Sequence, residues 1–101
     1  MIKTQAYTLV ILKAAQKISE PGAEKIIWEH GRRNFSLREE GKLSIVCPVN
    51  DGTAVVGVGI FSTDEKETRQ IIDGDPAVKA GIFTYEIHPC RSFPGDILPE
   101  K

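Results

Sequence analysis

The sequence predicts an α+β fold of the ferredoxin-like type, in the element order β-α-β-β-α-β. Four short segments are rich in β-branched and aromatic residues, as strands are. Two helical segments follow the first and third of these, and a short turn joins the second strand to the third. Such a chain forms one four-stranded antiparallel sheet with both helices on one face. The other face then needs a cover, commonly a second copy of the sheet, so we expect a homodimer.

The first strand is predicted at residues 6–12 (AYTLVIL), a nearly continuous apolar run that is typical of a strand buried on both faces. A polar connection with a proline and a glycine follows. We expect Pro21 to open the first helix, with Ser19 or Glu20 as its cap.

The first helix is predicted from residue 23 to residue 40, and Gly41 is expected to end it. One face combines apolar side chains with two polar ones at spacings of three and four: Ala23, Ile26, Ile27, His30, Asn34 and Leu37. The charged side chains are expected on the solvent side: Arg32, Arg33, Arg38, Glu39 and Glu40.

Residues 42–49 predict the second strand, and Pro48 indicates that it ends there or lies at an edge. Residues 50–53 (NDGT) are typical of a tight hairpin turn, because Asn, Asp and Gly tolerate positive φ. In the third strand, residues 54–62, Gly57 and Gly59 alternate with valines. A stripe without side chains leaves room for something else to approach the sheet.

The second helix is predicted to begin in a Ser/Thr/Asp cluster and to run through residues 62–73. A short helical turn at residues 75–81 leads to the last strand, residues 82–89. The length of 101 residues suits one small domain. We place this domain at residues 1–93, with an irregular tail at residues 94–101.

Composition excludes several classes of partner. The 13 Lys and Arg residues against 14 Asp and Glu residues give a net charge of -1, so neither nucleic acid nor an anionic membrane surface is expected. No apolar run approaches the roughly 20 residues that span a bilayer. The start of the chain is typical of a strand and not of a signal peptide, which indicates a cytoplasmic protein with Cys47 and Cys90 reduced.

Several short motifs, taken in order, resemble the YciI-related (YCII) family. They are a histidine on a helix (His30), the turn Gly41-Lys42-Leu43, Pro48, Asp75-Pro76 and the downstream Ala80-Gly81. The resemblance covers roughly residues 6 to 93. It implies a dimeric α+β barrel and an active site in which the helix histidine pairs with the aspartate before the proline. By that match the site residues are His30 and Asp75.

The resemblance also bears on activity and on the pocket. One related domain is associated with dehydrochlorination of a chlorinated aromatic compound, and other barrels of this fold include lactone isomerases and oxygenases. The chain departs from the family pattern at Val46-Cys47, where two small residues are usual. The bulkier pair is expected to narrow or reshape the pocket.

Two roles are open for His30, one structural and one catalytic. A histidine on the apolar face of a helix is often a core residue satisfied by hydrogen bonds. The functional reading is a general base, because an imidazole near its ordinary pKa of roughly 6.5 exchanges a proton near neutrality. A carboxylate on one ring nitrogen would fix the tautomer and leave the other nitrogen free.

Asp75 is the candidate carboxylate. Pro76 keeps Asp75 out of helical geometry, and Gly74 permits the backbone angle that the bend requires. The alternative is that Asp75 only caps the turn that starts at Pro76. Both roles are compatible if one oxygen caps and the other meets His30. Asp73 is expected to be solvated.

The remaining candidates are weaker. Cys47 has no neighbouring cation that would activate it as a nucleophile, and His88 is expected at the surface or an interface. No His, Cys, Asp or Glu spacing indicates a metal site, and no glycine-rich phosphate loop is present, so no cofactor is expected. Three arginines could bind an anionic substrate or simply be solvated: Arg32, Arg33 and Arg91.

Three functions remain open. The first is a small-molecule enzyme, of isomerase or lyase type, in which His30 oriented by Asp75 moves a proton without a cofactor. The second is a non-catalytic ligand-binding or accessory module that keeps the pocket without the chemistry. The third is a purely structural dimerisation domain, which predicts a buried His30 bonded only to backbone.

Overall fold

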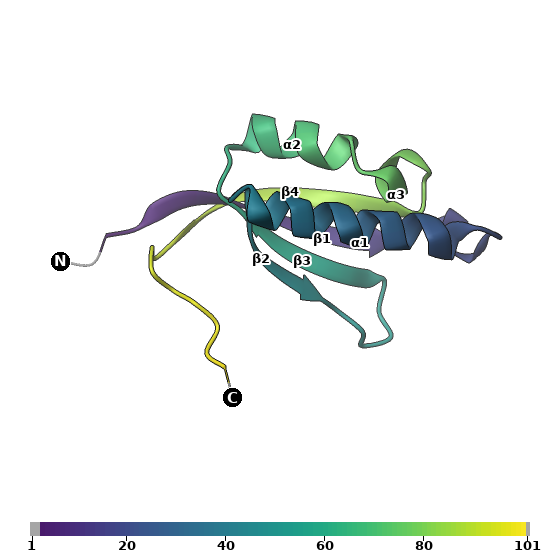
Figure 1. Ribbon diagram of the computed structural model, residues 1–101, viewed down its shortest axis with the longest axis horizontal. Coiled ribbons are helices and arrows are strands. Elements are labelled where there is room, and N and C mark those ends of the chain that lie inside the picture. Colours follow the sequence, from purple (N-terminus) through teal and green to yellow (C-terminus); the bar gives the residue numbers. More distant parts are fainter. Residues whose placement is uncertain (1–2, 101) are drawn as a thin grey trace.

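Four antiparallel strands form one sheet in the computed structural model, which describes residues 3–100. The strands are β1 (Gln5–Ala14), β2 (Leu43–Pro48), β3 (Val55–Phe61) and β4 (Phe83–Ser92), in the spatial order β2-β3-β1-β4. Helices α1 (Ala23–Glu39), α2 (Glu65–Asp73) and α3 (Pro76–Lys79) lie over one face of this sheet (Figure 1). The predicted βαββαβ architecture is therefore confirmed, with α3 as the predicted extra turn before the last strand.

The core lies between the helices and the sheet. Two clusters of buried side chains fill it, one around Val10, Leu37 and Ile72 and one around Ala77 and Phe83. The strand period of two places Val10 on the helix side of β1 and its neighbours Leu9 and Ile11 on the opposite side. The helix side therefore carries the core.

The opposite side of the sheet is also apolar. Because Ile60 pairs with Leu9 and Ile45 pairs with Ile60, these side chains share one face with Ile11. All four are half-buried, and none belongs to the core clusters. None of the described helices covers this face (Figure 1).

Helix α1 starts at residue 23 as predicted, but the segment before it differs from the prediction, because Pro21 does not open the helix. A short 3-10 helix, η1 (Gln16–Ser19), occupies the connection, and α1 begins at Ala23 after Gly22 with φ 88°. Neither Ser19 nor Glu20 caps α1, so that prediction was wrong. The Ser19 hydroxyl instead donates to the Gln16 carbonyl within η1.

The end of α1 follows the prediction. Gly41 has φ 77°, the left-handed conformation that glycine adopts without strain. The Lys42 amide donates to the Leu37 carbonyl, and the Gly41 amide donates to the Arg38 carbonyl, each at 3.0 Å. These bonds satisfy carbonyls at the helix end and direct the chain into β2.

The connection from β2 to β3 is longer than a tight hairpin. It runs from residue 49 to residue 54, and Gly52 alone has positive φ within it. Asp51 holds the loop by accepting from the amide and the hydroxyl of Thr53. Pro48 ends β2, which is an edge strand as predicted.

The last strand is longer than predicted. It continues through Pro89, which pairs with Thr8, as far as Ser92. Because β4 is an edge strand, the donor that Pro89 lacks is not needed by a further neighbour. Residues 93–100 contain no helix or strand. Across residues 3–100, no helix has the length and apolar character needed to cross a membrane.

Candidate functional site

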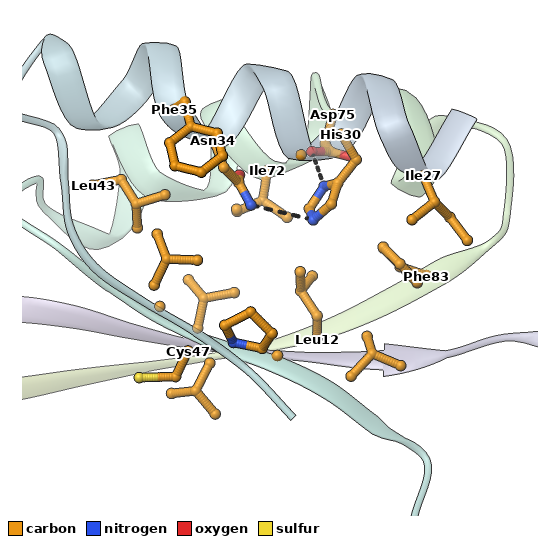
Figure 2. A pocket seen from close by; sticks show the side chains of 18 of the residues that line it. Leu12, Ile27, His30, Asn34, Phe35, Leu43, Cys47, Ile72, Asp75 and Phe83 are labelled. Atoms are coloured by element: carbon orange, nitrogen blue, oxygen red, sulfur yellow. Dashed lines mark hydrogen bonds and ion pairs between the residues drawn. The ribbon is translucent and has the colours of Figure 1, made fainter. Parts of the chain in front are cut away.

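His30 lies in the middle of α1, on the side that faces the sheet. Its side chain is 13% exposed, and its ring packs edge-on against the Phe83 ring, with 5.1 Å between centroids and 80° between planes. Phe83 is the first residue of β4, so the start of the last strand limits how the imidazole can rotate. The ring is therefore half-enclosed and aimed at the gap between helix and sheet (Figure 2).

Asp75 lies at the junction between α2 and α3. Its backbone is extended, with φ -71° and ψ 133°, as expected for a residue that precedes a proline. Its Oδ1 accepts from the Ala77 amide at 2.8 Å and from the Val78 amide at 3.4 Å. Asp75 is thus the N-cap of α3, with Pro76 as the first helical residue.

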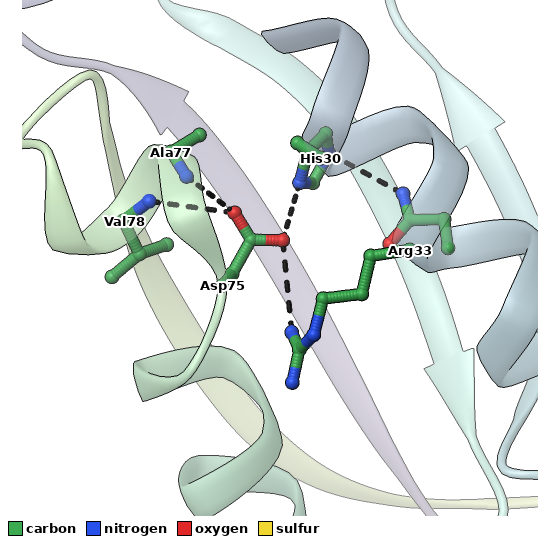
Figure 3. A network of polar contacts seen from close by, with 6 residues as sticks. His30, Arg33, Asp75, Ala77 and Val78 are labelled. Atoms are coloured by element: carbon green, nitrogen blue, oxygen red, sulfur yellow. Dashed lines mark hydrogen bonds and ion pairs between the residues drawn. The ribbon is translucent and has the colours of Figure 1, made fainter. Parts of the chain in front are cut away.

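The second oxygen of Asp75 meets His30. The Asp75 Oδ2 atom lies 2.6 Å from His30 Nδ1 (Figure 3). Because a carboxylate only accepts, Nδ1 carries the proton and donates it. The capping role and the contact with His30 therefore coexist on one carboxylate, as one of the predicted alternatives required.

Two opposing effects act on the Asp75 carboxyl. Burial raises its pKa, but the hydrogen bond and charge of His30, together with the amides of Ala77 and Val78, lower the pKa further than burial raises it. The net pKa is below the ordinary value of 3.8. Asp75 is therefore an anion at neutral pH although its side chain is only 4% exposed.

Arg33 also approaches the Asp75 carboxylate. Its Nη1 atom lies 3.8 Å from Asp75 Oδ2, and within the described chain this buried nitrogen makes no hydrogen bond. A Cβ on Gly74 would lie 3.2 Å from Arg33 Nη2, while Gly74 has an ordinary φ of -84°. Gly74 therefore provides space for the guanidinium and does not supply the special backbone angle that was predicted. The prediction that Arg33 lies on the solvent side of α1 was wrong.

Asn34 contacts the other imidazole nitrogen. Its Nδ2 atom lies 3.3 Å from His30 Nε2. Since an amide nitrogen can only donate, Nε2 accepts and carries a lone pair, which agrees with a proton on Nδ1. With the amide group turned over, Asn34 would present its oxygen to a protonated Nε2. Asn34 can therefore serve both charge states of the ring.

A cavity of about 500 Å³ opens beside His30. Its walls are mainly aliphatic side chains from β1, α1 and β2, among them Leu12, Ile27 and Leu43 (Figure 2). Gly57 and Gly59 of β3 also line it, which agrees with the space predicted beside this glycine stripe. The volume lies within the roughly 300–1,000 Å³ common for small-molecule pockets.

The bulky pair Val46-Cys47 forms part of the wall without filling the cavity. Val46 pairs with Gly59 across the sheet and also packs against the core. The Cys47 sulfur points away from the middle of the cavity (Figure 2). Cys47 is therefore not placed for attack on a molecule bound beside His30.

The other candidates lie elsewhere. His88 is exposed on β4, with Nε2 3.3 Å from Glu86 Oε1, and Arg91 donates to Thr4. Asp73 is exposed to solvent, as expected, and also accepts a 2.6 Å hydrogen bond from the Tyr85 hydroxyl. Within residues 3–100, no three side chains of His, Cys, Asp or Glu gather closely enough to hold a metal ion.

Two parts of the site were missed by sequence reasoning. Asn34 follows His30 by four residues, so the helical period already placed both on one face, and this was the available signal. Arg33 left no such signal. Its position depends on the packing of α1 against the junction of α2 and α3, which the sequence pattern does not describe.

Comparisons with known proteins bear on the fold. No protein-family model matches the chain, and no curated protein sequence matches it. Among solved structures, it is similar to 5-chloro-2-hydroxyhydroquinone dehydrochlorinase from Burkholderia phenoliruptrix AC1100, in complex with 2,5-dihydroxybenzoquinone. The TM-score is 0.54 at 18% identity, over 81% of this chain and 90% of the other. The similarity shows that the two proteins share the α+β fold with a four-stranded antiparallel sheet.

Proposed function

We propose that this chain is a small-molecule enzyme in which His30, oriented by Asp75, is the general base. The observation that carries the proposal is the 2.6 Å contact between His30 Nδ1 and Asp75 Oδ2, made beside an open cavity. A base needs a free lone pair within reach of the substrate and a partner that stabilises the charged ring. Nε2 supplies the lone pair, and the Asp75 carboxylate stabilises the imidazolium.

The reaction class that fits is isomerisation or elimination. Nε2 removes a proton from a carbon next to a carbonyl or enol group, and Asp75 balances the positive ring. The proton then returns to another carbon, or the electron pair expels a leaving group. Apolar walls exclude water and so strengthen the attraction between the imidazolium and the developing anion.

The structural neighbour supports an elimination. Its name identifies it as a dehydrochlorinase, a class of enzyme that eliminates hydrogen chloride, and its structure holds a small quinone. By analogy we propose a small cyclic organic substrate for this chain. We also propose that this chain belongs to the YCII-related family, because it carries the motifs that contain His30 and Asp75.

A homodimer is part of the proposal. Leu9, Ile11, Ile45 and Ile60 make the second face of the sheet apolar, and a second copy would bury it. Light scattering after size exclusion should give twice the chain mass, and Ile11→Lys should give a monomer. A wild-type chain that elutes as a monomer would exclude this arrangement.

One observation favours a non-catalytic ligand-binding module instead. Nε2 already accepts from Asn34, so its lone pair is engaged before any substrate arrives. The distance of 3.3 Å is longer than the usual 2.9–3.0 Å, and a substrate would compete for this weak bond. The third alternative predicted backbone partners only for His30, which the two side-chain contacts do not match.

Hydrogen–deuterium exchange tests the proposed base without a known product. A panel of monocyclic ketones, enols and hydroxyquinones in D2O is followed by proton NMR, with wild type, His30→Gln and His88→Gln. We expect exchange next to the carbonyl to be accelerated by wild type and by His88→Gln, and lost in His30→Gln. Equal acceleration by His30→Gln would contradict the proposal, and binding without acceleration would favour the ligand-binding module.

A further inference from the structure

Three polar side chains follow one line along α1 and line the cavity. His30, Asn34 and Arg38 are four residues apart, so they lie one turn after another on the same helix face. The first two contact each other, whereas Arg38 lies one turn beyond them. The line therefore leads from the proposed base to a cation.

Arg38 is the one Lys or Arg side chain among the described residues that line this cavity. It forms no ion pair within residues 3–100, in contrast to Arg33, which lies 3.8 Å from Asp75. An arginine presents a planar fork of donors that matches a carboxylate or another oxyanion. Arg38 therefore offers the apolar cavity a positive charge that no protein carboxylate takes up.

An exposed aromatic ring accompanies Arg38. The guanidinium carbon lies 5.6 Å from the centroid of the Phe35 ring, within the range of a cation–π contact. Phe35 also lines the cavity, although 64% of it is exposed to solvent. The ring holds the guanidinium at the cavity edge and adds a flat apolar surface beside it.

The distances suit a small ring. Eight residues of helix separate the backbones of His30 and Arg38 by about 12 Å. Arg38 is the longer of the two side chains, and its guanidinium carbon lies beside the ring of Phe35, three residues earlier, so the guanidinium reaches back along the helix and shortens this gap. A single ring with one charged substituent spans what remains.

We propose that Arg38, backed by Phe35, is an anion subsite, and that the ligand of this cavity is a single-ring organic anion. Its carboxylate or ionised hydroxyl pairs with Arg38, while its ring lies against the aliphatic walls and reaches towards His30. The choice of this substrate class rests on the proposed function. The anion subsite itself depends only on binding and does not require His30 to be a base.

A stabilising role at the helix end does not explain why the Arg38 side chain lines the cavity. A cation in the last turn stabilises a helix through the dipole, wherever its side chain points. The same helix offers a matched comparison in Arg32, whose guanidinium carbon lies 5.1 Å from the Trp28 centroid and which does not line the cavity. Both arginines stack on an exposed aromatic ring, but Arg38 alone of the two lines the cavity.

Ligand titration followed by amide NMR tests the subsite. The probes are benzoate, its neutral isostere benzamide, and 4-nitrophenolate at pH 8. The proteins are wild type, Arg38→Met, Arg38→Lys, Arg32→Met and His30→Gln. We expect wild type to bind benzoate about tenfold more tightly than benzamide, with shifts at the cavity amides of Gly57 and Gly59. Arg38→Met should lose this preference, Arg38→Lys should keep part of it, and Arg32→Met should keep all of it.

Each outcome decides the proposal. Binding of benzoate, of 4-nitrophenolate or of both that is weakened in Arg38→Met but not in Arg32→Met supports the subsite and says which anion it takes. No saturable binding of either anion, anion binding that Arg38→Met does not weaken, or equal loss in Arg32→Met overturns it. If His30→Gln exchanges deuterium like wild type yet benzoate binding still depends on Arg38, the proposed base is wrong and the subsite stands.

Discussion

One oxygen of the Asp75 carboxylate contacts His30, and the other oxygen caps helix α3. Oδ2 lies 2.6 Å from His30 Nδ1, while Oδ1 accepts from the first amides of α3. The capping bonds to Oδ1 orient the carboxylate independently of its contact with the imidazole. A rigid cap therefore determines the tautomer of a histidine forty-five residues earlier in the chain.

Two substitutions of Asp75 should separate its two roles. Asn caps helices as well as Asp does, so Asp75→Asn should keep α3 and cost about 1–2 kcal/mol of unfolding free energy. Its amide would donate to Nδ1, move the ring proton to Nε2 and remove the base. We expect the rate of enzyme-accelerated deuterium exchange, followed by proton NMR, to fall about a hundredfold to ten-thousandfold.

Asp75→Ala loses the cap and the buried partner of His30 together. We expect a cost of about 3–5 kcal/mol, measured by urea unfolding. Equal unfolding free energies for the Asn and Ala variants would show that capping by residue 75 does not stabilise the fold.

Acid should destabilise the protein through Asp75. Its pKa in the folded chain lies below the ordinary 3.8, so the stabilisation is fully present above about pH 4 and is lost as pH falls through the folded pKa. Urea unfolding between pH 6 and pH 2 should show this loss. Asp51 and Glu86, whose pKa values are also lowered, act in the same direction. The difference between wild type and Asp75→Asn isolates Asp75, and parallel curves would refute its contribution.

Arg33 should strengthen that pH dependence. Its charge lies 3.8 Å from Asp75 Oδ2, and removing it in Arg33→Met should bring the pKa of Asp75 closer to its ordinary value. The variant should therefore lose less stability than wild type between pH 6 and pH 2. Arg32→Met is the control, because Arg32 stacks on Trp28 and makes no ion pair with Asp75. A steeper loss in Arg33→Met would be inconsistent with this role.

The two cavity glycines should respond differently to a methyl group. At Gly57 the nearest atom to an added Cβ is the Cys47 carbonyl oxygen at 3.5 Å, an ordinary contact. At Gly59 a Cβ would lie 3.2 Å from a methyl group of the buried Leu43 and 3.4 Å from the Phe61 ring. Gly57→Ala should therefore match or exceed wild-type stability, by up to about 1 kcal/mol, and Gly59→Ala should be less stable than Gly57→Ala. Thermal unfolding measures both, and the reverse order would contradict the packing described for β3.

Much of the fold followed from periodicity. The strand pattern of β1 and the helical pattern of α1 are strong enough to place His30 towards the sheet. Asp75 was predictable for a local reason, since a residue before a proline leaves the helical region and suits an N-cap. Their meeting was predictable only through the family resemblance, because nothing local brings residues 30 and 75 together.

The remaining errors have tertiary causes. Pro21 suggested a helix start, but η1 takes up the connection and α1 begins after Gly22. Arg33 is a charged residue of the kind usually found at the surface, yet the space left by Gly74 lets its guanidinium lie beside Asp75. Both depend on where α1 lies against other elements, which a single-sequence pattern does not specify.

The proposed pairing of His30 with Asp75 is tested most directly by the tautomer of His30, which long-range proton–nitrogen NMR reads from the ring nitrogens of the neutral imidazole. His88, exposed on β4, provides an internal comparison. We expect a proton on Nδ1 and an unprotonated Nε2 in wild type, with the opposite assignment in Asp75→Asn. A wild-type ring that carries its proton on Nε2 would contradict the proposed pairing.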